Sequence, residues 1–119
     1  MKKEIKTFTV TDDDGNNIEC CAAIDEENNI FIYARGNRGW DDYEDGTTNP
    51  GPGVFVPDGY VVVNCGQSKP VVDALIRIGI LDEPEPAFRI KSNHIMLDVC
   101  RFNPDKAAEW NAYDALFAE

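Results

Sequence analysis

Two clusters of turn-forming residues divide the first third of the chain into three short segments, and this spacing constrains the fold most. Residues 6–10, 18–24 and 30–34 carry the alternating or continuous apolar pattern of β-strands. Segments 12–17 and 25–29 between them consist of Asp, Asn, Gly and Glu, among which Asp, Asn and Gly favour tight turns. The sequence therefore predicts a three-stranded antiparallel meander. We expect 30–34 to be its central strand, because it is apolar on both faces.

The second half of the chain carries both strand and helix signals. β-branched runs indicate buried strands, and a proline in the first turn followed by a terminal glycine indicates the limits of a helix. The elements expected are one or two strands at 54–56 and 60–64, a helix between Ser68 and Gly79, a hairpin of 88–91 with 95–100, and a helix from Asn103 to about 118.

The order of these elements, βββ-loop-ββ-α-ββ-α, defines an α+β fold. We expect an antiparallel sheet of about five to seven strands with two helices packed on one face. In the last helix Trp110, Tyr113, Leu116 and Phe117 recur at helical spacing, which predicts one aromatic stripe facing the sheet. Residues 1–119 show no repeat or linker, so the sequence predicts a single domain.

Residues 36–53 differ from the rest because they follow no strand or helix period. A stretch of this length and glycine content predicts a long exposed loop, and such loops often carry function. Its two large aromatic residues are favoured interface anchors, and the acids around them would steer a basic partner. The predicted binding residues are Trp40, Asp41, Asp42, Tyr43, Glu44 and Asp45.

The charge of the chain narrows the choice of partner. Twenty-two acidic residues against eleven basic ones give a net charge of −11. This excess excludes direct binding to nucleic acid or to an anionic membrane, because both require Lys and Arg. It favours a small acidic, non-enzymatic interaction protein with a basic protein partner. A sharper form of this hypothesis is a nucleic-acid mimic, or an inhibitor, that blocks a basic binding site.

An enzyme is the alternative hypothesis: a small hydrolase or polar-ligand-binding enzyme that uses carboxylates of the 36–53 loop. No motif supports a particular reaction. His94 is the single histidine, and the sequence places no Ser or Cys beside it. An EF-hand loop counted from Gly15 would begin at Val10, which cannot bind calcium through its side chain. The sequence therefore assigns no catalytic residue, no metal ligand and no cofactor.

The four cysteines and the lack of long apolar runs suggest where the protein resides. No pair of cysteines has the CxxC spacing of zinc or redox sites, so we expect reduced, buried thiols. No apolar run approaches the ~20 residues that a membrane helix needs, and the N-terminus lacks the apolar part of a signal peptide. These features predict a cytoplasmic protein. The cysteines are Cys20, Cys21, Cys65 and Cys100.

Overall fold

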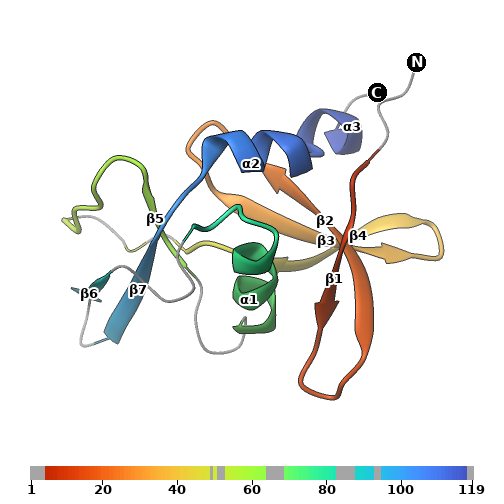
Figure 1. Ribbon diagram of the computed structural model, residues 1–119, viewed down its shortest axis with the longest axis horizontal. Coiled ribbons are helices and arrows are strands. Elements are labelled where there is room, and N and C mark those ends of the chain that lie inside the picture. The colour runs from red at the N-terminus through yellow and green to blue at the C-terminus, as the bar shows by residue number, and fades with distance from the viewer. Residues whose placement is uncertain are drawn as a thin grey trace.

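The computed structural model describes residues 5–48, 50, 53–63, 69–82, 88–92 and 95–117. They form an α+β fold in which all paired strands are antiparallel (Figure 1). None of the helices within these residues is long and apolar enough to cross a membrane. The elements are β1 (Phe8–Thr11), β2 (Asn17–Ile24), β3 (Ile30–Gly36), β4 (Gly39–Asp45), β5 (Tyr60–Val62), α1 (Lys69–Arg77), β6 (Phe88–Ser92), β7 (Ile95–Arg101), α2 (Pro104–Trp110) and α3 (Tyr113–Phe117).

The seven strands in the described residues form two sheets, whereas the sequence predicted one. The first sheet has the order β1-β2-β3-β4 and the second has the order β5-β7-β6. A bridge between Thr47 and Val63, with the Thr48 N–H donating to Val62 O at 2.9 Å, connects the two sheets. The prediction that residues 30–34, now part of β3, form the central strand of the first three is also wrong, because β2 lies between β1 and β3.

The two N-terminal turns form as predicted, and each is held by an aspartate. Asp12 Oδ1 accepts a hydrogen bond from the Asn16 N–H at 2.8 Å. Asp25 Oδ1 accepts from the N–H groups of Glu27 and Asn29, both at 2.9 Å. An aspartate that closes its own turn in this way fixes the register of the strands on either side.

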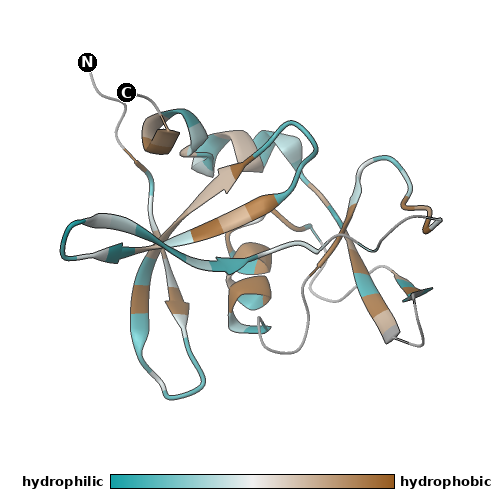
Figure 2. Ribbon diagram, turned by 180° about the vertical axis from the view of Figure 1, so that it is seen from behind, coloured by the Kyte–Doolittle hydropathy of each residue, from teal (hydrophilic) through white to brown (hydrophobic). Residues whose placement is uncertain are grey.

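A single apolar cluster joins both sheets to α1. It contains Val10 and Ile30 of the first sheet, Val61 of the second, and Leu75 of α1, all buried. Burying an aliphatic side chain of this size contributes about 1.5–3 kcal/mol, so the cluster is the main source of cohesion between the sheets. In Figure 2 the apolar colours lie on the inner strands and α1, and the outer end of the β3–β4 hairpin is hydrophilic.

The C-terminal helix is interrupted, and its two parts correct three predictions: one continuous helix, one aromatic stripe, and helices on one face only. Asn111 has extended backbone angles (φ −71°, ψ 117°) and separates α2 from α3. Trp110 packs edge-on against Phe8 at 5.9 Å between ring centroids, and Phe117 packs edge-on against Tyr33 at 6.0 Å. Phe8 belongs to the core cluster, whereas Tyr33 lies on the opposite face of the sheet. The aromatic residues therefore form no single stripe, and the helices cover both faces: α1 and α2 one, α3 the other.

Residues 36–53 include an edge strand, which corrects the prediction of a loop without regular structure. β4 pairs with β3 from Gly39 to Asp45 across the two-residue turn at 37–38. The pairing shifts by one residue, so Tyr43 forms a β-bulge. Residues 54–56 form no strand, and residues 49, 51 and 52 lie outside the described residues.

Candidate functional site

The predicted binding residues lie on both faces of β4. Cross-strand partners share a face of a sheet, so the pairing with β3 shows which side chains lie together. One face carries Trp40, Asp42 and Asp45, which is the face of the sheet that α3 covers. The cross-strand pairs on this face are Trp40 with Arg35, Asp42 with Tyr33 and Asp45 with Phe31.

The other three predicted residues lie on the core-facing side of the strand. Asp41 and Glu44 pair with residues on that face, and Tyr43 packs against the core cluster. Burial, followed by the negative charge of Glu44, raises the pKa of Tyr43. The six residues are therefore divided between the two faces of β4. Asp42, Tyr43, Glu44 and Asp45 nevertheless line one pocket at this end of the strand.

Trp40 is partly exposed, as predicted, but it has an intramolecular partner. The Arg35 guanidinium lies 4.8 Å from the centre of the Trp40 ring, a cation–π contact. Arg35 Nε also forms an ion pair with Glu19 at 2.9 Å. A partner that stacked on the ring face occupied by Arg35 would have to displace it, so Trp40 is a weaker anchor than its sequence context indicates.

Exposed aromatic rings lie on α3 beside the acids of β4. Phe117 and Tyr113 are 54% and 41% exposed, and their ring centroids are 4.8 Å apart. Phe117 also contacts Tyr33, which is the cross-strand neighbour of Asp42. Burial, followed by the charge of Asp42 and then by Cys21 and Asp45, raises the pKa of Tyr33. We call Tyr33, Tyr113, Phe117, Asp42 and Asp45 the aromatic–acidic face.

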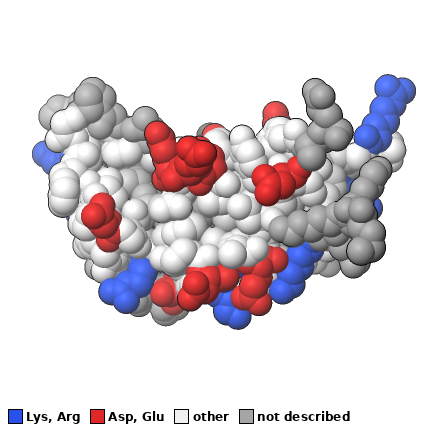
Figure 3. Space-filling model, turned by 90° about the horizontal axis from the view of Figure 1, so that it is seen from above, with Lys and Arg blue, Asp and Glu red and all other residues white. Residues whose placement is uncertain are grey.

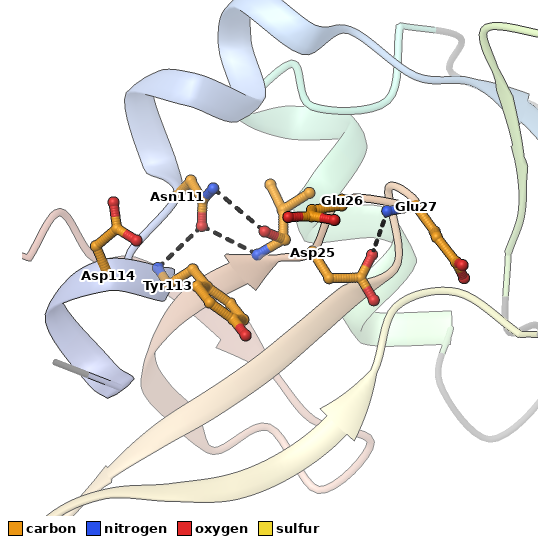
Figure 4. A pocket seen from close by; sticks show the side chains of 7 residues that line it. Asp25, Glu26, Glu27, Asn111, Tyr113 and Asp114 are labelled. Carbon is orange, nitrogen blue, oxygen red and sulfur yellow. Dashed lines mark hydrogen bonds between the residues drawn. The ribbon is translucent and has the colours of Figure 1, made fainter.

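A pocket of about 630 Å³ adjoins this face and shares Tyr113 with it. The β2–β3 turn and the start of α3 form its walls (Figure 4). In Figure 4 the Glu26 carboxylate extends toward Asn111, whereas Glu27 points away from it. We call this feature the acidic pocket, and it is lined by Ile24, Asp25, Glu26, Glu27, Asn111, Tyr113 and Asp114.

Asp25 has a structural role in the acidic pocket. Desolvation favours a higher pKa for Asp25, but hydrogen bonds from the Asn29 side chain and from the Asn29 and Glu27 N–H groups outweigh it and lower the pKa. Asp25 therefore holds the turn as a carboxylate. Glu26 and Asp114 are the acids that remain to face a ligand.

The acidic pocket suits a cationic group of a protein better than a metal ion. Its lining contains four carboxylates and no basic side chain. No three His, Cys, Asp or Glu side chains in the described part of the chain are arranged to hold a metal. Figure 3 views the side on which α2 and α3 lie, where acidic patches lie in the middle and along the lower rim, and basic atoms lie only toward the rim. A Lys or Arg side chain would find both carboxylates and aromatic rings here.

The described thiols are buried beneath the surface, although Cys21 is the cross-strand neighbour of Tyr33. Cys20 and Cys21 are buried free thiols, as predicted. Burial is the main reason that their pKa values rise, to about 12 for Cys20 and about 11 for Cys21. Such thiols stay protonated near neutral pH and are poor nucleophiles. Cys100 is buried as well, and Cys65 and His94 lie outside the described residues.

Comparison of this chain with protein-family models, curated proteins and solved structures gave no match. Its function is therefore inferred from the chemistry of its own surface.

Proposed function

We propose that this chain is a non-enzymatic interaction protein that binds a basic protein partner through the aromatic–acidic face and the acidic pocket. One observation carries the proposal: the exposed rings of Tyr113 and Phe117 connect two groups of carboxylates. Phe117 contacts Tyr33, which Asp42 and Asp45 influence, and Tyr113 lines the acidic pocket.

This combination of side chains matches the known requirements of a protein interface. Aromatic rings supply contact area with little loss of side-chain entropy, and they dominate binding energies at interfaces. Arg or Lys over an aromatic ring adds about 0.5–2 kcal/mol, depending on how far the pair is desolvated. The net charge of −11 would also accelerate encounter with a basic protein, and salt would weaken that effect.

The sharper form of the proposal is nucleic-acid mimicry. A basic surface that binds phosphates would also attract clustered carboxylates, so the chain would compete with DNA or RNA for it. Mimicry predicts that added nucleic acid releases the captured partner. A partner that is retained in excess nucleic acid would support binding without mimicry.

The test is capture of partners from the source cell on the immobilised chain. Washing at about 0.1 M and then about 1 M salt shortens the Debye length from ~10 to ~3 Å, which should release a partner held by charge. The variant Asp42→Asn/Asp45→Asn/Asp114→Asn should lose the partner at low salt.

A matched control keeps the change in charge but moves it elsewhere. Asp14, Asp58 and Asp105 are exposed and lie outside the aromatic–acidic face and the acidic pocket. The variant Asp14→Asn/Asp58→Asn/Asp105→Asn should retain the partner almost as well as the wild type. Equal loss in both triple variants would mean that net charge alone attracts the partner, and the proposed surface would be wrong.

A further inference from the structure

We propose that the partner contributes an extended basic segment that pairs with β4 and becomes a fifth strand of the four-stranded sheet. This inference rests on the proposed function, because it names the form in which the basic partner binds. It places the main-chain contacts at the edge of β4 and the side-chain contacts on both faces of that edge.

The edge of β4 has the geometry for strand addition. β4 is the last strand in the order β1-β2-β3-β4, and no strand in the described part of the chain pairs with its outer side. The Gly46 N–H donates to Ile30 O at 2.7 Å, and the two-residue turn closes the other end of the hairpin. Along an antiparallel strand, the main-chain groups of successive residues point alternately toward and away from the neighbouring strand. Counted from the turn, the N–H and C=O groups of Trp40 and Asp42 point away from β3. Among the described strands, none takes up these groups, so an added strand could pair with them.

The side chains of β4 specify the charge of that strand. Asp42 and Asp45 lie on one face of the edge, and Asp41 and Glu44 lie on the other. An added strand would place its side chains beside them on both faces, where pairs of opposite charge stabilise a sheet. The incoming segment should therefore carry Lys or Arg at neighbouring positions, with an uncharged residue opposite the bulge at Tyr43.

The same charges exclude a second copy of this chain as the added strand. Two β4 strands in antiparallel pairing would bring carboxylates against carboxylates on both faces, and like charges directly opposite each other destabilise a sheet. Charged side chains on edge strands prevent self-association for this reason. The acidic edge of β4 therefore disfavours pairing with β4 of a second copy and favours pairing with a basic strand.

The test uses a synthetic seven-residue peptide, blocked at both ends, in which two pairs of lysines flank one valine between terminal threonines. A second peptide has the same sequence but carries N-methyl groups on alternate amides, which keeps the charge and removes main-chain donors. Both are titrated against the full chain by calorimetry, and hydrogen exchange is followed in the complex. We expect the unmodified peptide to bind at least about tenfold more tightly, because main-chain hydrogen bonds supply the affinity in strand addition. We also expect it to slow exchange in residues 39–45.

Three results would overturn the inference. Equal affinity of the two peptides would show that charge alone attracts them, and slowed exchange only in residues 113–117 would place the peptide on the aromatic–acidic face. Binding of neither peptide would exclude a basic strand at this edge. Each of these results leaves the proposed function standing, because that function is tested separately by capture with the triple variants. Strand addition also predicts that Asp41→Asn/Glu44→Gln weakens the peptide about as much as Asp42→Asn/Asp45→Asn, whereas Asp58→Asn does not.

Discussion

Replacing Asn111 with alanine should loosen the aromatic–acidic face without changing any of its side chains. Asn111 Oδ1 accepts hydrogen bonds from the Ile24 N–H at 3.0 Å and from the Tyr113 N–H at 2.9 Å. The first bond satisfies a main-chain N–H at the end of β2 that β1 does not reach, and the second satisfies the first main-chain N–H of α3. The backbone bond from the Ala112 N–H to Ala22 O, at 2.8 Å, does not depend on the side chain and should remain.

The expected cost follows mainly from these two bonds, because the third bond of the side chain, from Asn111 Nδ2 to Ile24 O, is long at 3.4 Å. Loss of a helix-capping side chain costs about 1 kcal/mol. Loss of a hydrogen bond to the part-buried Ile24 N–H costs about 1–2 kcal/mol more, because that donor is left without a partner. Unfolding entropy of about 2.1 cal/mol/K per residue amounts to ~0.25 kcal/mol/K over 119 residues. A loss of about 2–3 kcal/mol should therefore lower Tm by roughly 8–12 °C.

Urea unfolding and thermal melting, both followed by circular dichroism, measure this cost. The matched control is Asn103→Ala at the start of α2, where Asn103 Oδ1 accepts from the Lys106 N–H at 3.1 Å. That variant loses a helix cap and an exposed hydrogen bond from Asn103 Nδ2 to Asp82 Oδ1 at 2.8 Å, but no bond to β2, so it should cost about 1 kcal/mol. If Asn111→Ala costs no more than Asn103→Ala, the bond to Ile24 contributes nothing and the reasoning is refuted.

Two further predictions concern the core and the thiols. Trp110→Ala should lower the free energy of unfolding by about 2–3 kcal/mol, because the ring packs against Phe8 in the core. Phe117→Ala should lower it by less than about 1 kcal/mol, because that ring is 54% exposed. Equal losses in urea unfolding would contradict this assignment. The raised pKa values of Cys20 and Cys21 mean that the folded state holds protons that the unfolded state releases above pH 9.0. Their contribution to stability should therefore be complete below pH 9.0 and fall as pH rises toward 11–12. A flat profile of unfolding free energy over this range, or rapid thiol labelling of the native protein at neutral pH, would be inconsistent with their burial.

Most elements could be predicted from the sequence, but β4 could not. Its residues run Gly-Trp-Asp-Asp-Tyr-Glu-Asp, and glycine and acids are unfavourable in strands. The bulge at Tyr43 also shifts the alternation by one residue, so no period of two is visible. The glycines at 36 and 39 flank a two-residue turn and were the available signal for a hairpin.

The candidate site was predicted only in part, because the acidic pocket is built from residues that lie far apart in the sequence. The β4 acids and their partner class were predicted from composition. The acidic pocket was not, because it joins the β2–β3 turn to Asp114 near the other end of the chain. The break at Asn111 depends on its bond to Ile24, 87 residues away, which no local pattern reveals. The local signal for a second helix start was Asn111 followed three residues later by Asp114, because Asn favours helix starts and an acid favours the first turn.

Hydrogen exchange of the chain with and without its captured partner shows which surface the partner covers. We expect slower exchange in the complex at residues 31–33, 42–45 and 113–117, which carry the aromatic–acidic face, and the effect should weaken as salt rises. Slower exchange confined to the sheet of β5, β7 and β6, or no change at residues 113–117, would contradict this expectation.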